Sequence, residues 1–247
     1  MEGDRQLNRW IDIHNHLLPA VDDGSVSMQQ TKNMLQIAYE DGIRYIIATP
    51  HYGAGCRNTD IAELEGKLEL VRQEAKQIDE AFRIELGNEL YYSEDIIEHL
   101  RKKKALTLAG TRYVLVEFAA DDDYREIKTG LHRLLIHGYL PILSHAEKYE
   151  CLYRNYEGIR DLIWLGAYMQ MNISSITGGY TGRWLVHCKK LLEYDLIHIL
   201  GTDAHSDYGR EPRISGGLEF IRKKFGELMI KQLMVENTLK LLQNERI

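Results

Sequence analysis

Two histidines that follow an apolar run are the most informative chemical feature of the sequence. Residues 10–13 read WIDI, and His14-Asn15-His16 comes directly after them. In an extended segment, residues i and i+2 project to the same side, so the two imidazoles face one point. Imidazole nitrogens arranged in this way are typical metal ligands. Asp12 either orients one of these ligands or serves as a hydrogen-bonding partner within the strand, and the sequence leaves both readings open.

Other residues of metal-ligand type stand where further apolar runs end. They are His51, Glu89, Glu117, His145, Asp203 and His205, the last two repeating the spacing of the first histidine pair. Asp23 is a ninth candidate, but Asp22-Asp23-Gly24 is also a common turn, and residue chemistry alone does not choose between these readings. The remaining histidines lie inside expected helices or strands, and we assign them structural roles: His99, His132, His137, His187 and His198.

The nine candidates comprise five histidines and four carboxylates, which is too many for one ion. A metal takes about four to six ligands, so the set fits two or three ions bridged by a shared carboxylate and a hydroxide. A mixed nitrogen and oxygen set without thiolate suits Mn, Fe or Zn rather than Ca. Four carboxylates bring a charge of −4 and three divalent ions bring +6. The filled site would therefore attract a phosphate dianion.

Such a site needs a scaffold that brings distant strand ends together. Helical periodicity alternates with short apolar runs along the chain. Strands are expected at 10–13, 43–49, 82–86, 113–116, 139–144, 168–171 and 196–200. Helices are expected at 27–41, 60–81, from about 93, and at 124–137, 156–165, 183–193, 216–224, 226–234 and 236–243. About seven strand–helix units imply an α/β fold with a parallel sheet, and parallel α/β barrels carry their active sites at the carboxyl ends of the strands.

Composition narrows the classes of function. The 247 residues show no linker, so a single domain spanning 1–247 is expected. A net charge of −6 argues against broad nucleic-acid binding, which depends on basic patches. Cys56, Cys151 and Cys188 are odd in number and far apart, which predicts no disulfide framework and fits a reducing cytoplasm. The polar start MEGDRQLNRW has no signal-peptide core. The sequence contains no run of about 18 apolar residues, so no membrane span is expected.

With these residues placed, the sequence resembles the PHP (polymerase and histidinol phosphatase) superfamily. It is most similar to the manganese-dependent tyrosine phosphatases of bacterial capsule and exopolysaccharide loci, the CpsB/YwqE type. The motifs that carry the resemblance span nearly the whole chain: IDIHNHLLPAVDDG, IATPHY, ELGNELYY, VLVEF, ILSHAEKY and GTDAHSDYGREPR. The first of these motifs is highly specific, whereas VLVEF alone would be weak.

The resemblance implies a distorted seven-stranded (β/α) barrel with a centre of three divalent ions, Mn²⁺ being the expected metal. It implies that His14, His16 and Asp203 hold one ion, Glu117 and His145 a second, and Asp23, His51 and His205 a third, while Glu89 bridges two. It therefore favours the ligand reading of Asp23 over the turn reading.

Two basic residues look like phosphate anchors in this family. Arg210 follows the Asp-x-His segment, and Lys148 lies three residues after His145. Family members typically carry Arg at the position of Lys148, and a lysine offers a point charge without the bidentate fork. The tyrosines that flank metal positions are interpreted as packing residues of the barrel rim: Tyr52, Tyr91, Tyr92 and Tyr149.

The expected reaction is hydrolysis of phosphotyrosine by a hydroxide that bridges the metals, with Arg210 stabilising the phosphoryl oxygens. By resemblance, the partner is a tyrosine autokinase that controls polysaccharide export. Histidinol phosphate or another small phosphomonoester is an alternative substrate, and a metal-holding regulatory module without turnover is a further alternative. A DNA exonuclease is disfavoured by the acidic charge. A cysteine-based phosphatase is excluded because no arginine stands six residues after any cysteine, where Ala62, Glu157 and Tyr194 occur.

Overall fold

The computed structural model describes residues 10–247, so the polar N-terminal stretch at 1–9 lies outside the described residues. In the described part, nine strands pair in parallel within two sheets, ordered β1-β2-β4 and β3-β5-β6-β7-β8-β9. The strands are β1 Trp10–Asn15, β2 Ile43–Ala48, β3 His51–Tyr52, β4 Arg83–Leu86, β5 Glu89–Tyr91, β6 Tyr113–Glu117, β7 Leu140–Leu143, β8 Tyr168–Asn172 and β9 Ile199–Gly201.

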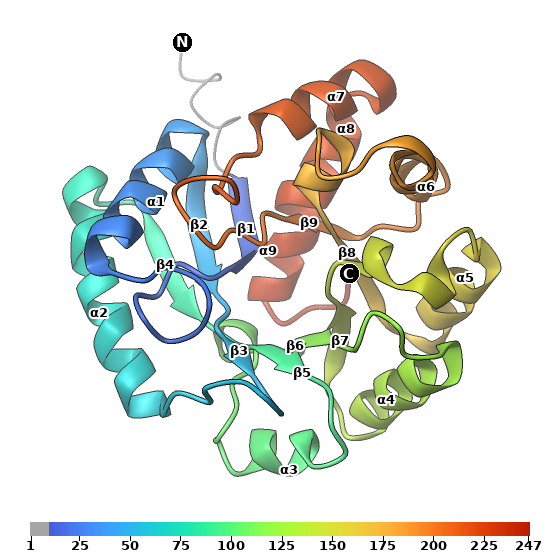
Figure 1. Cartoon of the computed structure of the whole chain (residues 1–247), viewed down its shortest axis with the longest axis horizontal. Helices are drawn as coiled ribbons and strands as arrows, with labels where there is room; N and C mark the ends of the chain where they lie inside the picture. The colour runs from blue at the N-terminus through green and yellow to red at the C-terminus, as the bar shows by residue number, and fades with distance from the viewer. Residues whose placement is uncertain (1–9) are drawn as a thin grey trace.

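Helices surround these strands, with α1 and α2 on one side of the molecule and α4 and α5 on the other (Figure 1). The helices are α1 Met28–Glu40, α2 Ile61–Ile78, α3 Ile96–Arg101, α4 Tyr124–Ile136, α5 Tyr156–Leu165, α6 Gly182–Glu193, α7 Ser215–Phe225, α8 Glu227–Lys231 and α9 Asn237–Leu242. The expected alternation of helices with parallel strands is confirmed, and the chain has an α/β fold.

Two of the expected strands are each followed, after a two-residue gap, by a short strand that the sequence analysis did not predict, which is why nine strands stand where seven were expected in the described chain. Thr49 and Pro50 separate β2 from β3, and Gly87 and Asn88 separate β4 from β5. Pro50 has no N–H to donate to a strand ladder, so pairing breaks there. A backbone hydrogen bond still crosses the gap, from Gly87 N–H to Ala48 O at 2.8 Å.

Backbone hydrogen bonds also join the first strand to the segment that follows the last one. The N–H of His16 donates to Ala204 O at 2.8 Å, and the N–H of Asp203 donates to His14 O at 2.9 Å. Residues that are almost two hundred positions apart in sequence therefore lie side by side at the carboxyl ends of β1 and β9.

Helix α1 begins after a serine cap and is followed by a glycine. Ser27 caps the helix by accepting a hydrogen bond from Gln30 N–H at 3.2 Å. Gly42 follows the helix with a φ of 94°, which a residue with a Cβ adopts only at a cost. The chain can therefore turn at once into β2.

The expected break near residue 235 between two tail helices is wrong. Helix α8 continues through a π-helical turn, Gln232–Glu236, into α9. No glycine or proline interrupts this stretch, and Leu233 and Met234 are buried, so packing holds the segment helical.

An apolar cluster fills the space enclosed by the strands, beneath the candidate ligands. It includes Ile11 and Ile13 of β1, Leu115 of β6 and Ile142 of β7, all buried. Leu241 of α9 packs into the same cluster, so the C-terminal helix covers the end of the strands opposite the ligand residues. A second, larger cluster lies between the strands and the helices. The strand framework is therefore packed on both faces, as buried parallel sheets require.

No helix in residues 10–247 is both long and apolar enough to cross a lipid bilayer. The three cysteines are free thiols: Cys188 is buried, and Cys56 and Cys151 are half-buried.

Candidate metal centre

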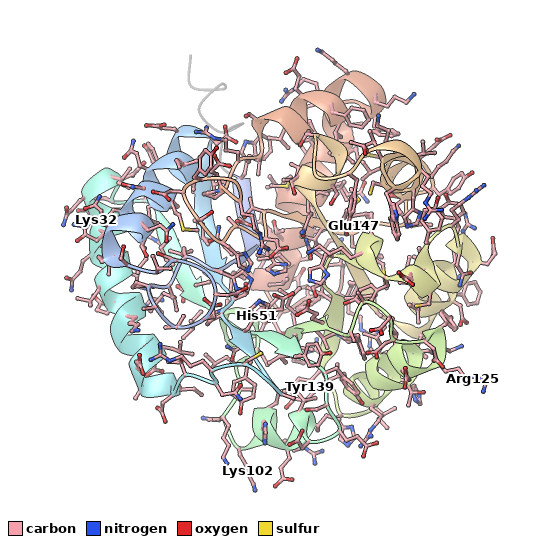
Figure 2. All side chains as sticks on the ribbon, viewed as in Figure 1. Lys32, His51, Lys102, Arg125, Tyr139 and Glu147 are labelled. Atoms are coloured by element: carbon pink, nitrogen blue, oxygen red, sulfur yellow. The ribbon has the colours of Figure 1, made fainter. Side chains whose placement is uncertain are left out.

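Glu89 stands at the middle of the candidate site. Its carboxylate lies 3.0 Å from His14 Nε2, 3.3 Å from His16 Nε2, 3.2 Å from His51 Nδ1 and 3.0 Å from His145 Nε2. Four imidazoles therefore surround one buried carboxylate: two from the end of β1, one from the start of β3 and one from the turn after β7. Figure 2 places His51 near the centre of the molecule over the strand ends.

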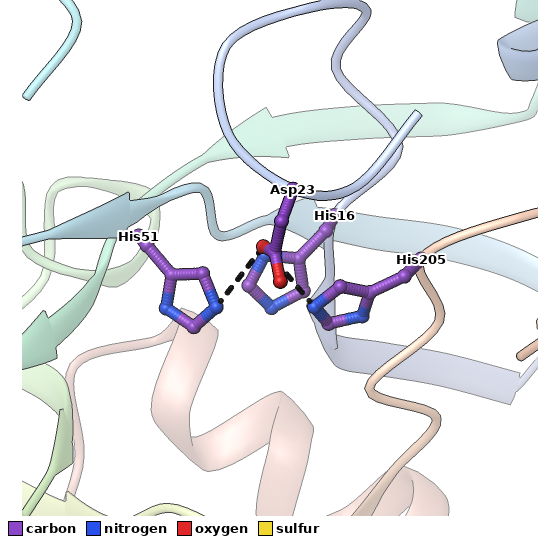
Figure 3. Close-up of side chains that lie close together, drawn as sticks. All are labelled: His16, Asp23, His51 and His205. Atoms are coloured by element: carbon purple, nitrogen blue, oxygen red, sulfur yellow. Dashed lines mark ion pairs between the residues drawn. The ribbon is translucent and has the colours of Figure 1, made fainter. Parts of the chain in front are cut away.

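The structure brings all nine candidates together in overlapping groups. The groups whose ligand atoms lie within 4.8 Å of one another are His14, His16, Glu89 and Asp203; His16, Asp23, His51 and His205; and His51, Glu89 and Glu117. His145 joins them through Glu117, at 3.3 Å. In Figure 3, Asp23 reaches between two imidazoles, 3.4 Å from His51 Nε2 and 3.6 Å from His205 Nε2. How the nine side chains divide among individual ions stays a prediction.

Backbone irregularities aim three of these side chains. The β1–β2 register shifts between Asp12 and Asn15, which marks a bulge or irregularity in the pairing. This shift accounts for Ile13 joining the inner apolar cluster while its neighbour His14 also points inward. His145 and Asp203 adopt left-handed conformations, with φ of 32° and 53°. Non-glycine residues are uncommon there, and such strain concentrates at functional sites.

Two glycines make room for the first histidine pair. A Cβ on Gly24 would lie 2.2 Å from the carbonyl oxygen of His16. A Cβ on Gly201 would lie 2.9 Å from Cβ of His14 and 3.0 Å from Nε2 of Gln170. The close approach of the 22–24 loop and of β9 to the site therefore requires glycine at both positions.

The chemistry of this donor set fits divalent cations. Glu89 is fully buried, and neither of its oxygens accepts a well-aligned hydrogen bond. His14 Nε2 and His16 Nε2 face each other at 3.2 Å. Unless one of the two nitrogens carries a proton and donates it to the other, both direct their lone pairs at the same point. A buried carboxylate and converging nitrogen lone pairs are unfavourable alone, and bound cations would compensate for both.

Protonation behaviour of the cluster leads to the same conclusion. Burial alone would lower the pKa of His16, but its contacts with Asp22 and Glu89 raise that pKa to about 10. Burial also opposes charge on His145, yet Glu117 and Glu89 raise its pKa to about 9. The carboxylates therefore attract positive charge strongly, and either protons or metal ions can supply it.

A chain of amide side chains links the candidate ligands. Oε1 of Gln170 accepts from the backbone N–H of His145 at 2.7 Å and lies 3.2 Å from His14 Nδ1. Nε2 of Gln170 donates to Asn172 Oδ1 at 3.0 Å, and Nδ2 of Asn172 donates to Asp203 Oδ2 at 2.7 Å. The sequence reasoning missed the role of Gln170. Its signal was period two from Tyr168, which places residues 168, 170 and 172 on one face of β8.

Asp22, rather than Asp12, orients a histidine ring. Asp22 Oδ2 lies 2.8 Å from Nδ1 of His16. Asp12 instead accepts hydrogen bonds from Thr202 Oγ1 at 2.6 Å and from Asn15 Nδ2 at 2.9 Å. Asp12 also accepts from the backbone N–H of His14 at 3.3 Å, so its role as a hydrogen-bonding partner within the strand framework is confirmed, and its contact with a candidate ligand is to the backbone rather than to the ring. Asp22 takes that position because the 22–24 turn folds back over His16.

The two expected phosphate anchors lie beside the cluster. Lys148 Nζ is 3.0 Å from Asp203 Oδ2, and a guanidinium nitrogen of Arg210 is 3.0 Å from Asp203 Oδ1. Both side chains line a cavity of about 440 Å³ that also reaches Arg213 and Tyr180. A cavity with three basic side chains next to a group of cation ligands can receive a phosphate ester. It is called the catalytic cavity below, after the role that we propose for it.

The tyrosines near the site mostly pack rather than line it. Tyr52 and Tyr149 are buried, Tyr92 stacks on Phe118 at 4.8 Å, and Tyr91 is half-buried. The five histidines that were assigned structural roles are absent from the metal-ligand groups within residues 10–247.

Comparison with known proteins gives this site a family context. The family model for capsular polysaccharide synthesis, CpsB/CapC, matches residues 10–243, a range that contains all nine candidate ligands. The chain belongs to the CpsB/CapC family. The resemblance inferred from the sequence motifs is therefore confirmed.

Two tyrosine-protein phosphatases are similar to this protein over almost the whole chain. The tyrosine-protein phosphatase CpsB of Streptococcus pneumoniae is 35% identical over 242 residues, covering 96% of this chain and 100% of CpsB. The tyrosine-protein phosphatase YwqE of Bacillus subtilis is 30% identical over 237 residues, covering 96% of this chain and 93% of YwqE.

A solved structure supports the same relationship. It belongs to the crystal structures of YwqE from Bacillus subtilis and CpsB from Streptococcus pneumoniae, described as unique metal-dependent tyrosine phosphatases. It superimposes with a TM-score of 0.87 and 30% identity over 96% of both chains. A D-hydantoinase, 13% identical with a TM-score of 0.54, shares the general fold alone.

Proposed function

We propose that this CpsB/CapC family member is a metal-dependent protein-tyrosine phosphatase that hydrolyses phosphotyrosine on a protein of capsule or exopolysaccharide synthesis. The carrying observation is the convergence of nine histidine and carboxylate side chains beside a cavity that holds Lys148 and Arg210. Relatives that are called tyrosine-protein phosphatases, at 30% and 35% identity, support the substrate class.

The nine candidates are proposed as the ligands of three divalent ions, with Mn²⁺ preferred over Fe or Zn. The ligand sets are those expected above, Glu89 being shared between two of them. When bound, the ions would lower the pKa of a water molecule toward neutrality and offset the charge of the phosphate. The absence of thiolates and the mixture of imidazole and carboxylate support this choice of metals.

The chain's own residues would bind and orient the phosphate ester. Lys148 and Arg210 project into the catalytic cavity and can donate charge-assisted hydrogen bonds to phosphate oxygens. Asn172 holds one oxygen of Asp203, so the carboxylate keeps its orientation when either cation turns to the substrate. The leaving phenolate has a parent pKa of about 10, so the reaction does not demand a dedicated proton donor.

The architecture and setting follow from the same proposal. We count β2 with β3 and β4 with β5 as single interrupted strands, which makes a distorted seven-stranded barrel of one domain. A tyrosine autokinase of polysaccharide export is the proposed partner, and the cytoplasm is the proposed location. The three free cysteines are compatible with a reducing compartment.

Metal content and turnover of the purified protein test the proposal together. Mass spectrometry should find between two and three equivalents of metal after reconstitution with Mn²⁺, roughly as the ligand count requires. Hydrolysis of a phosphotyrosine peptide should stop with chelator and return with Mn²⁺. Full hydrolysis in the presence of chelator, with metal absent by mass spectrometry, would exclude the proposed chemistry.

A further inference from the structure

A second cavity lies on the outer side of the fold between the start of α5 and the face of α6. It has a volume of about 320 Å³. Figure 1 shows both helices on the same side of the molecule. Its lining combines three aromatic with three basic side chains: Tyr153, Tyr156 and Tyr194, and Arg154, Arg183 and Lys190. It shares no lining residue with the catalytic cavity. This site is called the α5–α6 cavity below.

Two of its cations lack an acidic partner. Arg154 and Arg183 are exposed and form no ion pair within residues 10–247, whereas Lys190 pairs with Glu193 at 3.0 Å. The guanidinium of Arg183 lies 5.6 Å from the ring centroid of Tyr153. A guanidinium held beside an aromatic face is well placed to hydrogen-bond an anionic group on a ring that stacks there.

His187 is a buried, neutral ring beneath the tyrosines of the cavity. The side chain is buried, and its Nδ1 accepts from Arg154 N–H at 3.4 Å, so the neutral ring carries its proton on Nε2. Nε2 has no hydrogen-bond partner in the described chain. Burial lowers the pKa of His187 to about 4, which keeps the ring neutral. The neutral ring packs against Tyr153 and Tyr156, with ring centroids 5.3 Å and 5.8 Å apart, and so supports the aromatic lining of the α5–α6 cavity without adding charge to it.

A shared aromatic wall connects this cavity to the catalytic cavity. Tyr180 lines the catalytic cavity and stacks on Trp184 with ring centroids 5.7 Å apart. Trp184 in turn contacts Tyr153 of the α5–α6 cavity at 4.5 Å. A peptide that places one residue in the catalytic cavity can therefore lay its neighbouring residues across this wall.

We propose that the α5–α6 cavity binds a second phosphotyrosine of the same substrate polypeptide while the first occupies the catalytic cavity. Stacking tyrosines suit the phenyl ring, and the unpaired arginines suit the phosphate. The proposal rests on the proposed function, because it assumes a phosphotyrosine protein as the substrate.

Binding of non-hydrolysable phosphonate peptides to the manganese-reconstituted protein tests this site. Fluorescence anisotropy would measure the affinity of three peptides, each with a phosphonate analogue of phosphotyrosine at its first position. The second position carries the same analogue, glutamate or tyrosine, and the number of residues between the two positions is varied. At the best separation, the doubly substituted peptide should bind at least about tenfold more tightly than the other two. Arg183→Ala should remove that gain, and Arg183→Lys should restore part of it.

Lys189→Ala is the matched control, since Lys189 lies on the same helix but contacts Phe220 and does not line the cavity. It should leave the gain unchanged. Equal affinity for the glutamate and phosphonate peptides, or a gain that survives Arg183→Ala, would overturn the proposal.

Measuring the hydrolysis of phosphotyrosine separates the proposal of a second binding site from the proposed phosphatase function. Free phosphotyrosine should be hydrolysed equally by the native protein and by Arg183→Ala. If no phosphotyrosine is turned over, the proposed function fails, while the phosphonate binding data still decide whether the second cavity takes an anionic ring.

Discussion

Lys148 and Asp203 form an ion pair at the edge of the candidate metal centre, with Nζ 3.0 Å from Oδ2. Burial alone would lower the pKa of Lys148, but the Asp203 carboxylate raises it, so the ammonium stays charged. Arg210 contacts the other oxygen of the same carboxylate. The Asp203 carboxylate thus holds the Lys148 and Arg210 side chains at the catalytic cavity, where both can donate hydrogen bonds to a bound phosphate ester.

The first prediction concerns Lys148 as a phosphate anchor. Lys148→Ala should lower kcat/KM for a phosphotyrosine peptide by about a hundredfold, the order of effect seen when one donor to a charged transition state is lost. Lys148→Arg should retain activity, because arginine supplies the same charge with a bidentate fork. Steady-state kinetics measures both variants.

Lys102→Ala provides the control, since this lysine lies at the outer edge of the molecule (Figure 2). Metal content should be the same in all variants. A nearly native kcat/KM for Lys148→Ala would remove Lys148 from the phosphate site.

The second prediction concerns Gln170 as the link between His14 and His145. Gln170→Leu removes the acceptor for both histidines, so metal affinity should fall by about 10-fold to 100-fold. Gln170→Glu keeps an acceptor in place and should retain most of that affinity. Calorimetric titration of the metal-free proteins with Mn²⁺ measures the difference. Native affinity in Gln170→Leu would show that the histidines hold their orientation without it.

The positions of the candidate ligands along the chain could be predicted from the sequence, because the pattern of expected strands and the pattern of ligand-type residues agree. Apolar runs of strand length alternate with helical periodicity, and residues such as Glu117 or Asp203 come where those runs end. Parallel strands place their carboxyl ends on one edge, so residues far apart in sequence meet without any further information. The motifs around His14 and His16 then identified the family.

The detailed geometry of the candidate metal centre depends on tertiary contacts, which hydrophobic periodicity and secondary-structure propensity do not encode. The register shift in β1 and the left-handed backbone of His145 and Asp203 are local departures from the ideal strand. Neighbouring strands impose them, and no isolated sequence signal marks them. Gln170 escaped notice for a related reason: an amide within a strand looks like an ordinary solvent-facing residue until its partners are known.

The third prediction concerns the close packing at Gly201. A methyl group there would meet His14 Cβ at 2.9 Å, so Gly201→Ala should displace His14 and weaken Mn²⁺ binding. The overpacking should also destabilise the metal-free protein by about 1–3 kcal/mol. Denaturant unfolding and metal titration measure the two effects.

Gly66→Ala is the matched control, because Gly66 lies inside α2 and a Cβ there meets nothing within 4 Å. The same substitution should stabilise the protein by about 0.5–1 kcal/mol through helix propensity. If Gly201→Ala behaves like Gly66→Ala, the close approach to His14 is not a constraint on the site.

The fourth prediction concerns acid stability and His198. Burial lowers the pKa of His198 to about 4 from 6.5, and its Nδ1 accepts a hydrogen bond from Met169 N–H at 3.0 Å. The unfolded chain therefore binds a proton at this residue before the folded chain does, so stability present above pH 6.5 is lost as the pH falls toward 4. The loss should reach about 3 kcal/mol at most.

His198→Asn isolates this contribution, because its side-chain oxygen can replace Nδ1 as the acceptor while removing the titrating group. Urea unfolding of the metal-free proteins between pH 7 and pH 4 should show a shallower loss of stability in the variant, by up to about 3 kcal/mol across the range. Other histidines titrate in both proteins and cancel in the comparison. Parallel pH profiles for the two proteins would mean that His198 is protonated in the folded state as readily as in the unfolded chain, and that the Met169 hydrogen bond does not hold its ring neutral.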